Sequence, residues 1–295
     1  MALTVAILSP GEMGHAIGRT LRENGARAIT ALEGRSGRTV ELARAAGIDD
    51  VGMLARAVAE ADILMSVLPS AAAPGLGAAV AELVRAGSRA PLFVECNALA
   101  PPTVVQIAEG VRQAGAKVVD VGIVGSPPSG KRSPKIYASG PHADELLVLR
   151  EHGLDVRPMG PKIGQASGLK MCYGALTKGF QALGTELLLT AEKLDLLDPL
   201  MAELQDSQAA QLQWLERSVP GMPPKSRRWV SEMLEIAATL DSVGQSSGYH
   251  EAASAFFARV GETELGHERP ESRDQSRTLR QVVEELARAD RVVAG

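Results

Sequence analysis

Lys170 stands in a segment that is otherwise uncharged. From residue 166 to residue 176 the sequence reads ASGLKMCYGAL, in which most residues are small or apolar. A lysine on a solvated helix face normally has more polar neighbours, although a lysine that extends from a helix surface into solvent remains the alternative. Because a free lysine keeps its proton up to pH ~10.4, it can donate one when a carbonyl group is reduced. We therefore predict Lys170 as a catalytic proton donor and acceptor.

A second lysine, Lys178, follows eight residues later. In a helix this spacing is just over two turns, so both ammonium groups would lie roughly on one face. A nearby cation lowers the pKa of a lysine, which is what Lys170 would need to act as a base. We predict Lys178 as a substrate contact, and an ordinary surface lysine is the open alternative.

A glycine-containing turn follows the first apolar run of the chain, at residues 3–8. Its residues are Ser9, Pro10, Gly11, Glu12, Met13 and Gly14. Gly11 and Gly14 occupy the last two glycine positions of G-x-G-x-x-G, and Ser9 occupies the first. Glycines in such a turn let the backbone approach a pyrophosphate, whose charge meets the free N–H groups of a helix N-terminus. We predict that the turn binds a nicotinamide dinucleotide, with a purely structural strand-to-helix turn as the alternative.

The segment after the second expected strand contains both acidic and basic residues. Glu33 would accept the ribose 2'-hydroxyl of NAD(H), whereas Arg35, Ser36 and Arg38 would hold the 2'-phosphate of NADP(H). Two arginines beside a serine suit a dianionic phosphate better than a hydroxyl group. NADP(H) is therefore favoured over NAD(H), and a solvated basic loop that leaves Glu33 to bind NAD(H) is the alternative.

Strand and helix patterns alternate through the first half of the chain. The expected strands are residues 3–8, 26–32, 62–68, 91–96, 117–123, 135–139 and 155–159, and the expected helices between them include 39–46, 71–86, 102–114 and 141–151. Such alternation predicts a mostly parallel sheet. Residues 165–193 have helical spacing without proline, and the rest of the chain shows almost no strand pattern. We predict an α/β protein with a doubly wound, Rossmann-like NAD(P)-binding domain at residues 1–163 and an all-helical substrate and dimerisation domain at residues 164–295. A long helix joins them, and the charged last segment, 277–292, reads as a solvated helix.

Composition excludes several classes of protein. The 295 residues are 45% hydrophobic and 22% charged, and the formal net charge of −4 lacks the basic excess that nucleic-acid binding needs. No apolar run approaches the ~20 residues that cross a bilayer, and two cysteines make no disulfide framework. A cytoplasmic protein with no nucleic-acid or membrane partner is expected. The five histidines show no metal-ligand spacing, so we expect no metal.

Five segments resemble motifs of one superfamily. Residues 11–14 (GEMG) resemble G-x-M-G, 67–70 (VLPS) a strand-ending L-P segment, 95–101 (ECNALAP) the substrate motif D-x-S-T-x-x-P, 120–126 (DVGIVGS) D-A-P-V-S-G-G, and 163–170 (IGQASGLK) G-x-G-x-x-x-K. In this order the motifs are similar to those of the β-hydroxyacid dehydrogenases. That superfamily includes 6-phosphogluconate and 3-hydroxyisobutyrate dehydrogenases and is related to imine reductases. Residues 170–179 and 228–233 resemble a less characterised branch with a distinct helical C-terminal half.

The resemblance assigns expected roles to further residues. It implies that the segment Leu68, Pro69 and Ser70 passes near the nicotinamide, that Lys170 is catalytic, and that the substrate contacts include Asn97, Ala98, Gly125, Ser126 and Glu232. Asn97 also follows a strand end, where ligands bind in parallel sheets, so it is a candidate for both cofactor and substrate, with a turn-capping asparagine as the alternative. The family's asparagine four residues after the lysine is Gly174 here, which puts a simple 3-hydroxy acid substrate in doubt.

These patterns together predict an NADP(H)-dependent oxidoreductase. Its substrate would be a small polar hydroxy acid, alcohol or carbonyl compound. An imine or ketimine reductase is the first alternative, and a dinucleotide-binding sensor without turnover is an alternative of another class. The cluster Arg227, Arg228, Trp229 and Glu232 would either close the site from a partner subunit or anchor helix packing, and the second is favoured. A long helix with apolar faces suggests a homodimer.

Overall fold

The computed structural model of the chain describes residues 2–130 and 132–293. The chain divides into two units, Met1–Tyr173 and Gly174–Gly295. The predicted domain boundary after residue 163 falls just before helix α6 (Gln165–Lys193), whereas the boundary between the units falls within that helix. The first residues of α6 therefore belong to the first unit and its later residues to the second.

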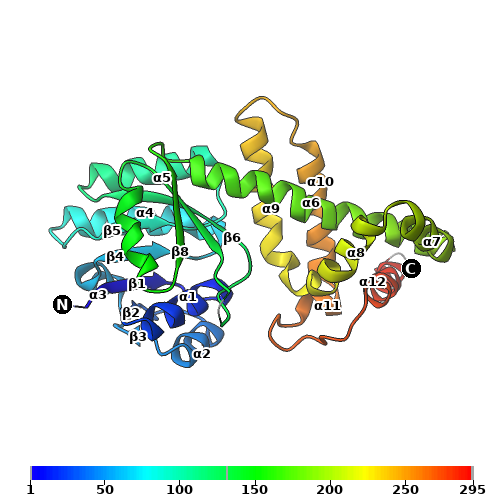
Figure 1. The fold of residues 1–295 in the computed structure, drawn as a ribbon, viewed down its shortest axis with the longest axis horizontal. Helices are drawn as coiled ribbons and strands as arrows, with labels where there is room; N and C mark the ends of the chain where they lie inside the picture. Colours follow the sequence, from blue (N-terminus) through cyan, green and yellow to red (C-terminus); the bar gives the residue numbers. More distant parts are fainter. Residues whose placement is uncertain (1, 131, 294–295) are drawn as a thin grey trace. The chain divides into compact units, whose positions relative to one another are not determined.

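An eight-stranded sheet forms the centre of the first unit (Figure 1). Its strands are β1 (Thr4–Leu8), β2 (Arg27–Thr30), β3 (Asp49–Asp50), β4 (Ile63–Ser66), β5 (Leu92–Glu95), β6 (Val118–Val124), β7 (Lys135–Ser139) and β8 (Asp155–Gly160). They lie in the order β3-β2-β1-β4-β5-β6-β7-β8. All neighbouring pairs are parallel except β6 and β7. The predicted Rossmann-like, mostly parallel sheet is confirmed.

Helices cover both faces of this sheet. They are α1 (Glu12–Glu23), α2 (Gly37–Ala45), α3 (Leu54–Glu60), α4 (Ala73–Arg85) and α5 (Pro101–Gln113), with 3₁₀ helices η1 (Ser70–Ala72) and η2 (Ala143–Arg150). α3, α4 and α5 pack on one face around the fully buried Phe93. α1 and η2 pack on the other, where Ile17 and Leu146 are buried. Because both faces are covered, the central strands are apolar almost throughout, as their sequence indicated.

The strand order reverses between β1 and β4, which are neighbours in the sheet but not in the sequence. Crossovers from β1 run toward β3 on one side, and from β4 toward β8 on the other. In open parallel sheets, ligands bind outside the carboxyl ends of the strands at such a reversal. The segments that follow β1 and β4 lie at this reversal, and the segment that follows β5 lies beside it.

Two local features differ from the sequence-based prediction. The expected helix over residues 141–151 is the 3₁₀ helix η2, whose buried residues Ala143, Leu146 and Leu149 recur every three residues, the repeat of that helix type. The short elements β3 and α3 were not predicted. β3 has two exposed residues and α3 is seven residues long, so neither carries a usable hydrophobic period.

The second unit consists of helices. Besides the later part of α6 they are α7 (Leu197–Ser207), α8 (Ala209–Ser218), α9 (Ser226–Asp241), α10 (Gly248–Gly261), α11 (Glu264–His267) and α12 (Leu279–Val293), with 3₁₀ helices η3 (Val219–Gly221) and η4 (Pro223–Lys225). α9 and α10 pack through an edge-to-face contact between Trp229 and Phe257. α12 is more than a solvated helix: Leu279, Val282 and Leu286 are buried, so one face packs against the unit.

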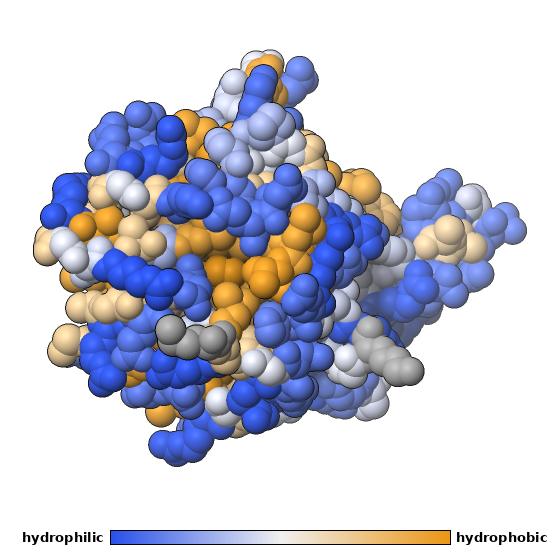
Figure 2. Space-filling model, turned by 60° about the vertical axis from the view of Figure 1, so that its left-hand side comes forward, coloured by the Kyte–Doolittle hydropathy of each residue, from blue (hydrophilic) through white to orange (hydrophobic). Residues whose placement is uncertain are grey.

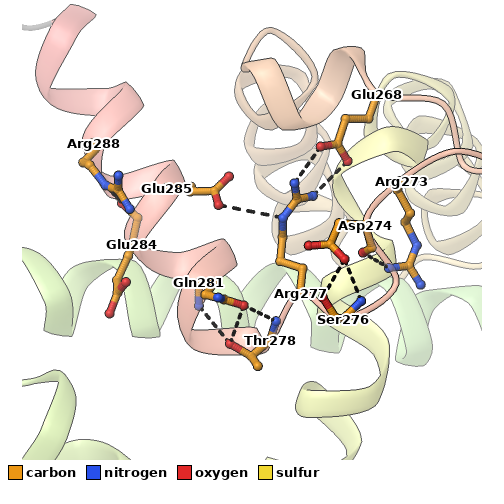
Figure 3. A network of polar contacts seen from close by, with 10 residues as sticks. All are labelled: Glu268, Arg273, Asp274, Ser276, Arg277, Thr278, Gln281, Glu284, Glu285 and Arg288. Carbon is orange, nitrogen blue, oxygen red and sulfur yellow. Dashed lines mark hydrogen bonds and ion pairs between the residues drawn. The ribbon is translucent and has the colours of Figure 1, made fainter.

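An arginine-centred network holds the loop before α12 (Figure 3). Arg277 donates two hydrogen bonds to the carboxylate of Glu268, at 2.8 and 2.7 Å, and also lies 3.8 Å from Glu285 of α12. The Arg277 side chain is only 13% exposed. A two-point contact between a guanidinium and a carboxylate fixes direction as well as distance. It therefore ties the segment after α11 to the start of α12.

Hydrophilic side chains cover most of the face drawn in Figure 2, and hydrophobic side chains gather in a central area of it. No helix in the described part of the chain is long and apolar enough to cross a membrane.

Candidate active site

The turn after β1 has the backbone shape of a dinucleotide-binding turn. Ser9 adopts a left-handed conformation with φ of 61°, which costs an ordinary residue ~1–2 kcal/mol and glycine much less. The Gly11 N–H then donates to the Ser9 carbonyl oxygen at 2.7 Å. Ser9 therefore occupies the position of the first glycine in the G-x-G-x-x-G motif, and the chain still makes a tight turn there.

The glycines that follow bring α1 close to the sheet. A Cβ atom on Gly14 would lie 3.1 Å from the side chain of Ile7 and 3.7 Å from that of Val67. Gly18, which the sequence-based prediction did not include, is more constrained, because a Cβ there would lie 2.5 Å from Ile48. The sequence signal for this close packing was the position of Gly18, four residues after Gly14 in an apolar stripe.

The N-terminus of α1 lies directly after this turn. Gly11 is the N-cap residue of α1, and as a glycine it has no side chain that could cap the helix end. Helix geometry leaves the first backbone N–H groups without partners within the helix, and the helix dipole makes this end positive. Because Gly11 has no Cβ atom, a pyrophosphate could approach its backbone closely, and the positive helix end would favour the negative charge of that group.

The segment after β2 borders a groove of about 450 Å³. Its lining residues are Leu32, Glu33, Val40, Asp50, Gly52 and Met53. Asp50 shapes the groove, since its Oδ1 accepts hydrogen bonds from the backbone N–H groups of Leu32 and Gly52, at 3.1 and 2.8 Å. Asp50 was not predicted, because the short strand that carries it has no sequence pattern. The groove lies beside the residues that were predicted to contact the ribose of the coenzyme.

The residue predicted to favour NAD(H) and those predicted to favour NADP(H) all lie at this groove or beside it. Glu33 lines it, and Arg35 is exposed two residues later. Ser36 is the N-cap of α2, and its Oγ accepts from the Thr39 N–H at 3.3 Å. Arg38 lies in the first turn of the same helix and is half-buried. A helix N-terminus with two guanidinium groups near it suits an added phosphate, while Glu33 suits a hydroxyl group.

Asn97 links the ends of β4 and β5. Its Oδ1 accepts a hydrogen bond from the Leu68 N–H at 2.6 Å, and its Nδ2 donates to Ser66 Oγ at 2.7 Å and to Glu95 Oε1. The Asn97 side chain is 3% exposed. Asn97 therefore holds two strand ends together.

Glu95, the last residue of β5, is an ionisable group that the sequence-based prediction treated only as part of a motif. It is 1% exposed, and its Oε1 also accepts from the Asn97 backbone N–H at 2.9 Å. Burial raises the pKa of Glu95 to about 7, against the opposing effect of its hydrogen bonds and of the Lys170 charge. Burial was not visible in the sequence, where a glutamate is normally a surface residue.

The side chain of Lys170, a residue of α6, reaches the end of β5. Its Nζ donates a hydrogen bond to the backbone carbonyl oxygen of Cys96 at 3.1 Å, and its side chain is half-buried. This contact brings the ammonium group beside the strand end that carries Asn97. The predicted proton donor and a predicted ligand contact are thus neighbours within the first unit.

A buried carboxylate places the helix that carries Lys170. Asp120 of β6 accepts hydrogen bonds from the Ser139 hydroxyl and from the backbone N–H groups of Gly164 and Ser167, at 2.9, 2.9 and 3.1 Å. The Ser167 hydroxyl donates to its other oxygen at 2.5 Å. The carboxylate therefore caps the start of α6 with a negative charge.

Gly122 lets the same helix lie directly on the sheet. A Cβ atom there would lie 2.3 Å from the carbonyl oxygen of Ala166 and 3.2 Å from Cβ of Lys170. A larger residue would displace the backbone of α6. Asp120 and Gly122, two residues of the degenerate motif at 120–126, therefore fix where the start of α6 lies on the sheet.

The remaining predicted contacts are spread around these strand ends. Pro69 is exposed and precedes η1, in which Ser70 is buried. Ala98 is buried, and Gly125 and Ser126 are exposed beyond β6. Gly125 has φ of 123°, a conformation that only glycine adopts readily. None of these residues has a geometry that by itself assigns a ligand.

In the second unit, Lys178 and Glu232 form an ion pair. Lys178 Nζ donates to Glu232 Oε2 at 2.5 Å, and the two side chains are 17% and 13% exposed. Arg228 lies 3.2 Å from the other carboxylate oxygen, and the Lys178 ammonium lies 5.8 Å from the centre of the Trp229 ring. Two residues predicted as separate substrate contacts are therefore partners of each other.

Arg227, in the predicted cluster around Trp229, contacts groups of the same unit. Arg227 donates to the carbonyl oxygen of Gly261 at 2.9 Å and also contacts His267.

Within the described residues, no group of three histidine, cysteine, aspartate or glutamate side chains could hold a metal ion. Cys96 is buried and Cys172 exposed, and they form no disulfide.

Residues 4–147 match the model of the NAD binding domain of 6-phosphogluconate dehydrogenase. The first unit contains an NAD-binding domain of the 6-phosphogluconate dehydrogenase type. Residues 191–260 match a domain of unknown function, DUF1932. The predicted resemblance to the 6-phosphogluconate dehydrogenase type is confirmed for the NAD-binding domain, and the C-terminal half is helical as predicted.

Three known proteins show how far the likeness extends beyond the NAD-binding domain. An uncharacterised 28.5 kDa protein from Methanothermus fervidus is 29% identical over 208 residues, 70% of this chain and 79% of that protein. The structure of Mycobacterium tuberculosis 3-hydroxyisobutyrate dehydrogenase with L-serine covers 92% of this chain and 98% of its own, with a TM-score of 0.70 and 16% identity. An imine reductase variant from Myxococcus stipitatus in complex with NAD+ covers 89% of this chain and 93% of its own, with a TM-score of 0.52 and 18% identity. At such identities the two structures show the fold.

Proposed function

We propose that the protein is an NADP(H)-dependent oxidoreductase that acts on a small polar hydroxy acid, alcohol or carbonyl compound, with Lys170 as the proton donor and acceptor. The observation that carries this proposal is the hydrogen bond from Lys170 Nζ to the Cys96 carbonyl oxygen. It puts an ammonium group at the carboxyl edge of the sheet, on a strand next to the reversal in strand order where NAD-binding domains bind their ligands.

A nicotinamide held at the turn after β1 would supply the hydride for reduction and would accept it in oxidation. In reduction, Lys170 gives a proton to the substrate oxygen as the carbon receives the hydride. The resulting amine recovers its proton from water, which the half-buried side chain can reach. Asn97 keeps the ends of β4 and β5 at a fixed separation throughout, because its amide bonds both strands.

The preference for NADP(H) is proposed from the residues after β2. Arg35 and Arg38 beside the N-terminus of α2 would neutralise a 2'-phosphate, and Ser36 would donate a hydrogen bond to it. Arg38→Ala should therefore weaken NADPH binding about tenfold or more and leave NADH binding nearly unchanged, by isothermal titration calorimetry. Arg44→Ala, an exposed arginine of the same helix, is the matched control. Equal losses for both coenzymes would contradict the preference.

The catalytic proposal is tested by single-turnover fluorescence of bound NADPH against small hydroxy acids, aldehydes, ketones and cyclic imines. Lys170→Met should lose at least 100-fold in the rate of hydride transfer and retain NADPH affinity. Lys162→Met is the control, because it removes an equal charge at an exposed position near the start of α6. Lys170→Met that reacts at the parental rate would remove Lys170 from the mechanism.

A second candidate function is the reduction of cyclic imines or ketimines. The structural likeness to an imine reductase and the replacement of the family's asparagine by Gly174 favour it. In this case Lys170 would give its proton to nitrogen instead of oxygen. Reduction of imines without oxidation of any alcohol would select this function, and tight NADPH binding without turnover of any compound would indicate a sensor.

Substrate contacts in the second unit are proposed at the Lys178–Glu232 pair. Because each side chain neutralises the other, the pair presents a dipole to a substrate and not a bare charge. A cation beside an aromatic ring with a carboxylate partner can exchange that partner for a substrate carboxylate. We further propose a homodimer formed through the helical half, to be checked by sedimentation at micromolar concentration.

A further inference from the structure

Glu95 has one carboxyl oxygen that is satisfied and one that is not. Oε1 accepts from the backbone and side-chain N–H groups of Asn97. Oε2 is buried and has no hydrogen-bond partner within the described part of the chain. A buried acceptor without a partner is costly, and it is rare in native proteins unless it serves a purpose. A proton on the carboxyl group would sit on this second oxygen, because Asn97 already occupies the first.

The Lys170 ammonium is the nearby cation. It is bonded to the carbonyl oxygen of Cys96, the residue that follows Glu95, and its charge acts on the Glu95 carboxyl group. Burial raises the pKa of Glu95 to about 7, and the Lys170 charge opposes that rise. The two groups are therefore electrostatically coupled, and coupling is reciprocal.

The other strands add one acid and one hydroxyl group around Glu95. On β6 its register partner is Asp120, and on β4 its register partner is Ser66. Asp120 is engaged by the start of α6, so it is held in place. The adjacent Cys96 thiol is affected by the same charges: burial raises its pKa first, the Glu95 and Asp120 carboxyl groups raise it further, and Lys170 lowers it. The half-buried Lys170 and the buried acids Glu95 and Asp120 therefore all act on the Cys96 thiol.

We propose that Glu95 is a positioning residue that sets, through the charge of its carboxyl group, how readily Lys170 gives up its proton in the reaction. This inference rests on the proposed role of Lys170. When Glu95 is ionised it stabilises the ammonium form, so Lys170 is a weaker acid. When Glu95 is neutral, Lys170 releases its proton more easily. Glu95 returns to its starting protonation after each turnover, since the proton consumed by the substrate is replaced from water through Lys170.

The coupling can be measured without coenzyme or substrate. Glutamate labelled with ¹³C at its carboxyl carbon reports the titration of Glu95 by NMR, and its signal is assigned by its loss in Glu95→Gln. Lys170→Met should raise the titration midpoint of Glu95, because a stabilising cation is lost. Lys162→Met removes an exposed lysine and should leave the midpoint unchanged. An unaltered midpoint in Lys170→Met overturns the proposal, whatever reaction the protein catalyses.

The functional consequence appears in the pH dependence of single-turnover reduction by NADPH. The parental rate should fall as pH rises through the Glu95 midpoint measured by NMR. Glu95→Gln mimics the neutral acid, so its rate should stay at the parental acid-side value across that range. Glu95→Asp keeps an ionisable group and should restore a pH-dependent step. The same pH dependence in parent and Glu95→Gln overturns the proposal.

The two experiments separate the two levels of inference. Failure to reduce any compound, together with a coupled Glu95 titration, would reject the proposed function and leave the coupling between Glu95 and Lys170. Activity lost in Lys170→Met together with an uncoupled Glu95 would reject the role of Glu95 alone. Should Glu95→Gln fail to fold, Glu95→Asp also removes the labelled glutamate and assigns the signal, and the titration in Lys170→Met still decides.

Discussion

The carboxylate of Asp120 holds Ser167 through two hydrogen bonds, 2.5 Å from its hydroxyl oxygen and 3.1 Å from its backbone nitrogen. Ser167 stands in the first turn of α6, three residues before Lys170. The position of the lysine along the sheet edge therefore depends on a buried acid on a different strand.

Asp120→Asn should lower both stability and turnover. An amide replaces one acceptor oxygen with a donor, which must face either the Ser167 hydroxyl or three other donors. The lost acceptor should cost about 2–3 kcal/mol of unfolding free energy, measured by urea denaturation. NADPH affinity should change less than the rate of hydride transfer. Asp144→Asn, at an exposed position of η2, is the control, and equal effects in both variants would argue against a specific role.

Ser9→Gly should be more stable than Ser9→Ala by about 0.5–1 kcal/mol. Both variants lose the hydroxyl group, so the comparison isolates the backbone at φ of 61°. The left-handed conformation costs alanine ~1–2 kcal/mol, and the larger conformational freedom of glycine in the unfolded chain offsets part of this difference. Thermal or urea unfolding measures it. Equal stability of the two variants would show that the turn is not strained at this residue.

The raised pKa of Glu95 should make stability depend on pH. The folded protein holds this proton up to about pH 7, whereas the ordinary value is 4.5. The contribution of Glu95 to the free energy of unfolding is therefore largest below pH 4.5. It falls as the pH rises toward 7 and is constant above that. The difference corresponds to about 3.5 kcal/mol, at ~1.4 kcal/mol per pH unit. Glu95→Gln should lose this decline in urea-unfolding series from pH 5 to 8, and an unchanged decline would assign it to other groups.

Arg277→Ala should loosen the end of the second unit. It removes a two-point contact with Glu268 at a mostly buried guanidinium and leaves that carboxylate without its partner. A loss of about 2 kcal/mol is expected, with faster amide hydrogen exchange in the segment before α12. Arg288→Ala, at an exposed position of α12, should change stability by less than ~0.5 kcal/mol. Equal losses of stability in both variants would contradict a specific role of the contact between Arg277 and Glu268.

Much of the site could be predicted because its parts are local. The turn at Ser9 to Gly14 is adjacent to its strand and helix, and the long helix that carries Lys170 begins at the predicted residue, Gln165. Gly18, Asp50 and Glu95 were missed for a common reason. Each acts through a residue far away in the sequence: Ile48 for Gly18, Leu32 for Asp50, and Lys170 for Glu95.

The order and spacing of residues determined by themselves the alternation of strands and helices, the glycine turn, and the presence of one lysine in an uncharged helical segment. These follow from backbone preferences and hydrophobic period, which act over a few residues. Only the tertiary structure decided that Lys170 meets the end of β5, that Asp120 holds the start of α6, and that Lys178 pairs with Glu232. Burial and distance across the fold set these contacts and the proton affinity of Glu95, and no local pattern encodes them.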